Sequence, residues 1–152
     1  MTGQPISWRQ SYNNDPAVIY ALDRHLKLVH CNEAWDLFAR RNDAPELAGI
    51  RMLGTCIMDV VPESLTDYYT AVYDAVRRFQ RHWWHVFDCS SQNVSRQFQM
   101  NILPAGDDGI IVVNTLIREE AHEERLTARI EEYTDAGGIV TMCANCRRAE
   151  PR

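Results

Sequence analysis

The sequence predicts an α+β domain in which five antiparallel strands form one sheet and the helices cover one face of it. Three observations carry this prediction. Two short apolar segments follow a polar N-terminal stretch, a long amphipathic helical segment comes after them, and three further strand-like segments follow that helix. Helices inserted between the second and third strands of such a sheet pack together on one face.

The bulk properties of the chain limit its class. Its 152 residues suffice for one domain with short additions, and 45% hydrophobic and 24% charged residues are typical of a globular protein. A formal net charge of -5 argues against nucleic acid or an anionic membrane as a partner. No apolar run approaches the ~20 residues that span a bilayer, and the polar N-terminus does not have the pattern of a signal peptide. We therefore expect a cytoplasmic protein.

The first predicted element is a hairpin that follows an N-terminal cap segment at residues 1–16. Residues 17–22 and 26–31 form two short apolar runs, and Asp23 lies at the turn between them. Short apolar runs separated by polar turn residues are typical of paired strands.

Helices are predicted after the hairpin. Asn32 is placed to act as N-cap of a helix over residues 33–42, because its side chain can accept a bond from the first turn. A Gly-punctuated stretch with brief helices follows. Residues 64–80 then form a helix of four to five turns, whose predicted buried stripe comprises Leu65, Tyr68, Tyr69, Val72, Val76 and Phe79.

Three strands are predicted next, at residues 82–90, 95–103 and 109–117. The first is rich in aromatic residues, the second alternates apolar and polar side chains, and the third follows the turn PAGDDG. A helix is predicted over residues 118–133, where helix formers predominate and a narrow apolar seam resembles part of a coiled coil, at Leu126, Ile130 and Tyr133.

The segment DPAVIYALDRHLKLVHCNEAW resembles the opening hairpin of the PAS sensor family, with Asp23 closing the first strand and Asn32 capping the next helix. The resemblance covers about residues 12–118 and follows the element order of that family. It implies a sensory or protein-interacting module, usually coupled to a histidine kinase or a response regulator. On this basis the chain divides into a cap segment, a PAS domain, a signalling helix and a CxxC tail, at residues 1–16, 17–118, 119–134 and 135–152.

The tail EEYTDAGGIVTMCANCRR is similar to that of a group of bacterial signalling proteins, in which a coiled coil leads to an apolar CxxC; the second cysteine pair usual there is missing from these residues. Cys143 and Cys146 could bind zinc if the same pair of a second chain completed the four ligands. The spacing would also serve a thiol redox pair, or the tail could be inert. Attachment of c-type haem is excluded because Arg147 follows the second cysteine.

A space between the sheet and the helices is the second candidate site. Its predicted lining comprises Tyr20, Trp35, Phe38, Phe98 and Met100. A small-molecule pocket and a filled core fit these residues equally well.

Haem and flavin are weaker cofactor hypotheses than zinc. Haem b would need an axial ligand such as His30 or His85, and a flavin photoreceptor would need a reactive-cysteine motif that the stretch around Cys56 does not match. His82 and His85 are three apart on a strand and therefore point to opposite faces, which disfavours a shared metal ion.

No Ser–His–Asp set, phosphate-binding glycine loop or HExxH helix is found, so we do not expect an enzyme. The sequence predicts a homodimeric PAS-type sensory or regulatory module of bacterial signal transduction. It would sense a small ligand or a redox or metal state, and its C-terminal helix would relay the signal to a kinase or regulator protein. The alternative hypothesis is a metal-binding or thiol-redox adaptor that uses the CxxC, with the PAS fold as a dimerisation platform.

Overall fold

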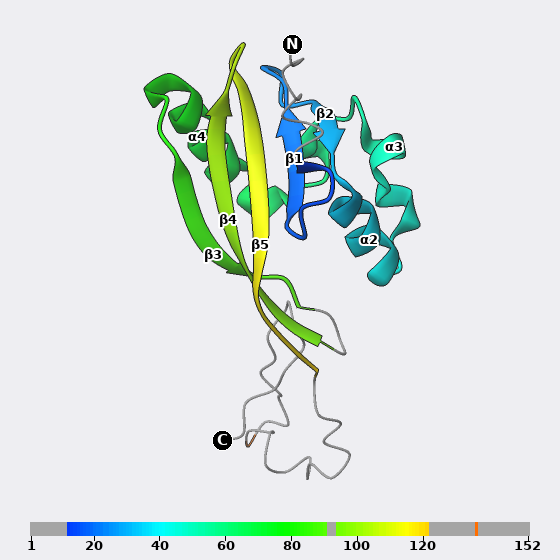
Figure 1. The fold of residues 1–152 in the computed structure, drawn as a ribbon. Helices are drawn as coiled ribbons and strands as arrows, with labels where there is room; N and C mark the ends of the chain where they lie inside the picture. The colour runs from blue at the N-terminus through cyan, green and yellow to red at the C-terminus, as the bar shows by residue number, and fades with distance from the viewer. Residues whose placement is uncertain (1–11, 91–93, 122–135, 137–152) are drawn as a thin grey trace, which may run out of the picture. The chain divides into compact units, whose positions relative to one another are not determined.

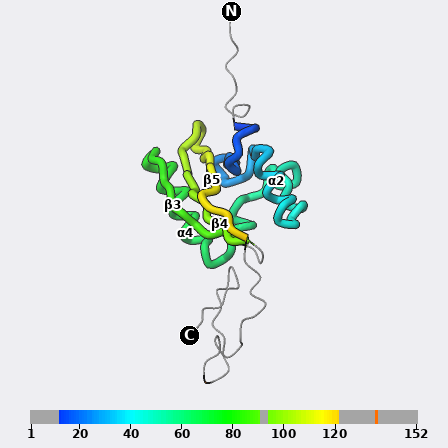
Figure 2. Tube along the Cα trace, turned by 60° about the horizontal axis from the view of Figure 1, so that its bottom comes forward, coloured from blue at the N-terminus to red at the C-terminus, as the bar shows by residue number. Residues whose placement is uncertain are grey.

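The computed structural model describes residues 12–90, 94–121 and Ala136 (Figure 1). Its centre is a five-stranded sheet in the order β2-β1-β5-β4-β3. Figure 2 also shows β3 at the edge of that sheet. The predicted α+β class is confirmed, and so is the predicted order of elements from the hairpin to the fifth strand. The elements are β1 (Val18–Leu22), β2 (Leu28–Cys31), α2 (Glu33–Arg41), the short 3₁₀ helix η1 (Pro45–Leu47), α3 (Gly49–Met52), η2 (Ile57–Asp59), α4 (Glu63–Phe79), β3 (Trp83–Asp88), β4 (Val94–Ala105) and β5 (Gly109–Ala121).

The chain divides into two compact units, Met1–Val86 with Gln99–Thr115, and Phe87–Phe98 with Leu116–Arg152. The first contains every helix named above, together with β1 and β2. Its fully buried side chains include Tyr73, Ile19, Leu22, Leu28, Ile102, Ile110 and Val112. Within residues 12–90 and 94–121, no helix is long and apolar enough to cross a membrane.

The predicted hairpin is formed by β1 and β2, which pair antiparallel, and β1 also pairs antiparallel with β5. The Asp23 carboxylate accepts hydrogen bonds from the backbone N–H groups of His25 and Lys27, at 2.8 and 3.0 Å. The second strand begins at Leu28 rather than at residue 26. Leu26 has a φ of 57°, a left-handed turn conformation that cannot continue a strand.

Asn32 caps α2 as predicted and also holds the preceding chain in place. Its Oδ1 accepts hydrogen bonds from the backbone N–H groups of Trp35 and Ile19, at 3.2 and 3.0 Å. Its Nδ2 donates to three backbone carbonyls, those of Tyr12, Asp15 and Ala17. The side chain is 1% exposed, so one buried amide connects the start of α2, the strand β1 and residues 12–17.

The buried face of α4 differs in part from the predicted stripe. Val72, Tyr73 and Val76 are buried, and Tyr73 was not among the predicted positions. The contact face follows the i, i+3, i+4, i+7 spacing from Tyr69, so the predicted positions outside that run are exposed: Leu65, Tyr68 and Phe79.

The last strand is longer than predicted. Arg118–Ala121 belong to β5, so the prediction of a helix starting at Arg118 is wrong for these residues. Glu119 pairs with Arg96 of the adjacent strand β4 at 2.6 Å, and strand pairing there outweighs the local helix propensity. The rest of the predicted signalling helix and the CxxC tail lie outside the described residues.

Candidate functional site

A pair of buried tyrosines connects the sheet to α4 in the first unit. Tyr20 of β1 is 5% exposed and Tyr73 of α4 is 1% exposed, and the Tyr20 hydroxyl donates a hydrogen bond to the Tyr73 oxygen. Burial raises the pKa of Tyr73 to about 12 and the pKa of Tyr20 well above its ordinary value of 10.0. Both phenols are therefore neutral at neutral pH, and one of them donates to the other.

Three more rings surround this pair, and we call the five residues Tyr20, Trp35, Tyr69, Tyr73 and His85 the tyrosine cluster. The Trp35 ring of α2 meets Tyr20 edge-on at 5.3 Å, and Tyr69 lies 5.9 Å from Tyr73. The Tyr69 hydroxyl lies 3.4 Å from Nε2 of His85 on β3, whose pKa burial lowers. Because Tyr20 touches both Trp35 and Tyr73, α2 and α4 cover the same face of the sheet.

Asn114 of β5 is a buried polar residue whose side-chain oxygen is not accounted for by the contacts above. It is 9% exposed, and its Oδ1 finds no hydrogen-bond donor anywhere in the described part of the chain. Its Cα partner on β1 is Val18, two residues before Tyr20, whose own partner is Val112. Opposite residues and residues two apart share a face of a sheet, so Asn114 and Tyr20 project to the same side.

The residues predicted to line the cavity have different surroundings. Tyr20 and Trp35 are in direct contact, Met100 is buried in the same unit, and Phe38 is half-buried on α2. Phe98 is buried too, and its ring stacks on a second phenylalanine within the other unit. That these side chains enclose a ligand cavity stays a prediction.

Two residues of the layer were missed from the sequence, although signals for both were present. Tyr73 lies four residues after Tyr69 and three before Val76, the spacing of a buried helix face. Asn114 interrupts the apolar run GIIVVNTLI at a position where alternation predicts a buried side chain. A polar residue at a buried strand position is the more informative of these two signals.

No described residues form a metal site: in residues 12–90 and 94–121, no three His, Cys, Asp or Glu side chains are grouped so that they could hold an ion. Burial, followed by the charge of Asp36, raises the pKa of the Cys31 thiol to about 11, which keeps it protonated and unreactive at neutral pH. Cys143 and Cys146, the predicted zinc ligands, lie outside the described residues.

The buried tyrosine pair is expected to make the free energy of unfolding fall as the pH rises into the alkaline range. The pKa of Tyr73 is about 12 in the folded chain, and the ordinary pKa of an exposed tyrosine is 10.0. As the pH rises, Tyr73 therefore loses its proton in the unfolded chain first. The stabilisation is complete below pH 10 and is lost as pH rises toward 12. We expect Tyr73→Phe to flatten this decline by about 2 to 3 kcal/mol, while costing about 1–2 kcal/mol at pH 7 because the Tyr20 hydroxyl loses its acceptor. Urea unfolding from pH 7 to 11.5 tests this, with the exposed-site variant Tyr68→Phe as control; equal slopes in both variants would contradict it.

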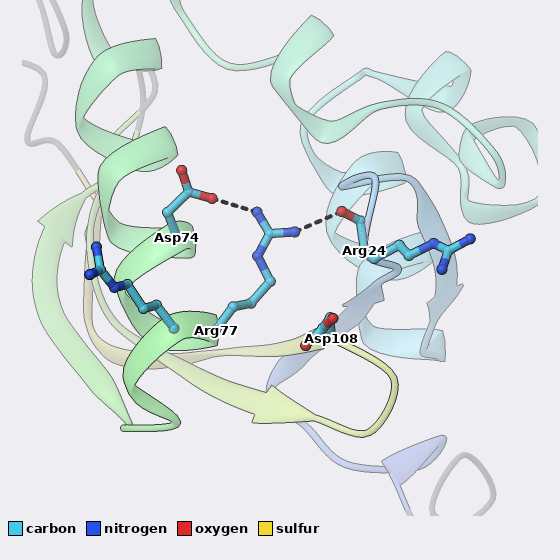
Figure 3. Close-up of a pocket in the computed structure, with 5 residues that line it drawn as sticks. Arg24, Asp74, Arg77 and Asp108 are labelled. Carbon is cyan, nitrogen blue, oxygen red and sulfur yellow. Dashed lines mark hydrogen bonds and ion pairs between the residues drawn. The ribbon is translucent and has the colours of Figure 1, made fainter.

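A surface groove of about 460 Å³ lies between the hairpin turn, the end of α4 and the β4–β5 turn (Figure 3). Arg77 spans it: one guanidinium nitrogen donates to the Arg24 carbonyl and another pairs with Asp74, both at 2.7 Å. The other two residues that line it are Arg78 and Asp108. The charge of Arg77 is therefore already paired within the protein. Its two interactions connect α4 to the hairpin, and we call them the Arg77 clasp.

Arg77→Lys is expected to lower the free energy of unfolding by about 1 kcal/mol, because lysine has a single nitrogen in place of the two guanidinium nitrogens that reach the Arg24 carbonyl and Asp74 separately. The neighbouring Arg78→Lys is the matched control and should change it by less than about 0.5 kcal/mol. Urea unfolding of both variants measures the difference, and equal losses would show that the clasp contributes nothing.

The strand order and the single helical insertion define the class: the chain has the PAS fold. Its structure is similar to the PAS domain of BvgS from Bordetella pertussis, with a TM-score of 0.57 and 19% sequence identity over 73% of this chain and 84% of that one. It is also similar to VqmA in the phage VqmA–DPO complex, with a TM-score of 0.54 and 17% identity over 73% of this chain and 51% of that one. No protein-family model and no curated protein sequence matches the chain.

Proposed function

We propose that the protein is a non-enzymatic sensory module of bacterial signal transduction, which binds a small molecule between its sheet and the helices α2 and α4. The observation that carries the proposal is Asn114 Oδ1, a buried acceptor that has no donor among the described residues and lies on the face that also carries Tyr20. A buried acceptor left unpaired is costly, and a ligand with an N–H or O–H group would remove that cost. The PAS fold, shared with the PAS domain of BvgS, supports the class.

Side chains from three elements surround the proposed ligand site and could transmit ligand binding to the rest of the chain. Trp35 belongs to α2, Tyr73 to α4 and Asn114 to β5, and β5 leads into the C-terminal part of the chain. A ligand that contacts all three favours the packing state in which they are closest. The shift would reach a partner kinase or regulator protein through the segment after residue 121.

Ligand binding can be tested with the Asn114→Val variant. Thermal unfolding of the full chain is followed with DPO, the compound of the VqmA complex, and with a set of planar heterocycles that carry N–H or O–H donors. A ligand at 100 times its Kd adds about 2.7 kcal/mol, or roughly 5–10 °C in Tm for a domain of this size. Asn114→Val should be at least as stable as the wild type without ligand, because it removes an unpaired polar group, and should not respond to the ligand.

Two results would count against this reading. If no compound raises the Tm of the wild type, the ligand class is wrong. If a compound stabilises wild type and Asn114→Val equally, it binds elsewhere. Val113→Ala, at the next and half-buried position of β5, is the control that should keep the ligand response.

We also propose that the chain forms a homodimer in which Cys143 and Cys146 of two chains share one zinc ion, since four thiolates complete a structural site. Protein purified without chelator should then contain about one zinc per two chains, and Cys143→Ser with Cys146→Ser should contain none. A metal-free wild type whose two thiols oxidise reversibly would favour the redox adaptor instead.

A further inference from the structure

The strand β3 is an open edge of the sheet. It is last in the strand order and has β4 as its one neighbour among the described strands. No other strand of the described residues pairs with its outer side, and edges of this kind are usually blocked by Pro, Lys or a bulge. The sequence WWHVFD contains neither Pro nor Lys.

Large apolar side chains are exposed along this edge. Trp84 is 59% exposed, Val86 44% and Trp83 42%. Beside them, Phe79 at the end of α4 is 61% exposed and lines a mostly apolar groove of about 410 Å³ together with Trp83. Four such side chains at one edge indicate a surface that another polypeptide covers.

The residue pattern of β3 is complementary to itself. His85 faces α4, where it lies near Tyr69, so Trp84 and Val86 project from the opposite face. If two copies pair antiparallel with their His85 residues opposite each other, Trp84 lies opposite Val86 of the second copy. The same register sets Trp83 opposite Phe87, a pair of aromatic side chains.

We propose that two copies of this chain pair antiparallel through β3, with His85 at the two-fold axis, so that their sheets join into one. The inference rests on the homodimer of the proposed function and names its interface. Each axis-related Trp84–Val86 contact occurs twice, as a closed two-fold interface requires. Aromatic and β-branched residues opposite each other are a favourable cross-strand pair, and the added strand contact supplies main-chain hydrogen bonds.

Charge substitutions on the exposed side of β3 test the register. Trp84→Glu and Val86→Lys each place a charge opposite an apolar residue in both halves of the interface, and each should raise the dimer dissociation constant about tenfold or more. The double variant places a glutamate opposite a lysine in both halves of the interface and should recover most of the affinity. Sedimentation of the full chain over a concentration series measures this, with EDTA present so that zinc at the tail cannot hold the chains together.

The control is Ile50→Glu, at an 85% exposed position of α3 that lies outside β3 and should leave the dimer unchanged. Circular dichroism confirms that each variant is folded. Single variants that dimerise as well as the wild type would overturn the β3 interface while the homodimer stands. Single variants that weaken the dimer without recovery in the double variant would overturn the register. A wild type that is monomeric in EDTA would overturn the β3 interface, and a wild type that stays monomeric with zinc and without EDTA would overturn the homodimer as well.

Discussion

Asn32→Ala is expected to lower the free energy of unfolding by about 3–5 kcal/mol, the largest effect of any single change considered for this chain. The side chain makes five hydrogen bonds, two as acceptor and three as donor. Alanine removes the cap of α2, worth about 1 kcal/mol. It also leaves the Ile19 N–H and the Ala17 carbonyl buried without this partner, at about 1–3 kcal/mol for each group.

Urea unfolding measures the loss, and Asn42→Ala is the matched control. Asn42 follows α2 at its other end, is half-buried, and its side-chain amide donates to the Phe38 carbonyl at 2.8 Å, so its removal should cost about 1 kcal/mol. Asn32→Asp keeps the accepting oxygen and removes the donor, so it should still be strongly destabilised. An Asn32→Asp protein as stable as the wild type would show that the three carbonyl contacts contribute nothing.

Gly49→Ala is expected to cost about 1–3 kcal/mol, because the position has no room for a methyl group. A Cβ at residue 49 would lie 2.1 Å from Sγ of Cys31 and 3.3 Å from Oδ1 of Asp36. The Gly49 N–H donates to that same Asp36 oxygen at 2.6 Å, which prevents α3 from moving away without losing the bond. Either Cys31 or the start of α3 must therefore shift.

A double-mutant cycle identifies the cause. Cys31→Ala removes the sulfur atom in the way, so Gly49→Ala should cost much less in the Cys31→Ala background than in the wild type. Gly106→Ala is the matched control, since a Cβ there meets nothing within 4 Å and stability should barely change. If the cost of Gly49→Ala is the same in both backgrounds, the steric explanation is wrong.

The elements of this fold could be predicted from local patterns. Alternation over β4, the hairpin around Asp23 and the helical spacing of α4 each involve neighbours within a few residues. The cap at Asn32 was predictable for the same reason, because an N-cap bonds to the turn that follows it. The additional bonds of Asn32 to residues 12–17 were not, since they depend on how the preceding chain returns to the hairpin.

The sequence did not predict correctly those residues whose burial or conformation depends on contacts with other elements. Tyr73 was not predicted as buried, and Phe79 was predicted as buried but is 61% exposed. Helix periodicity gives the spacing of a buried face but not how far the sheet extends beneath it. Likewise, Arg118–Ala121 have helix-forming side chains yet complete β5, because the pairing of β5 with its neighbours outweighs local propensity.

The sequence by itself determined the class of the domain, the order of its strands and helices, and the CxxC spacing of the tail, because these follow from composition and short-range periodicity. Only the tertiary structure decided which polar groups lack partners and which apolar ones stay exposed. Asn114 is buried without a donor among the described residues, and Trp84 is exposed at an open edge. Both facts depend on the arrangement of strands distant in the sequence, since burial is set by all the elements that surround a side chain.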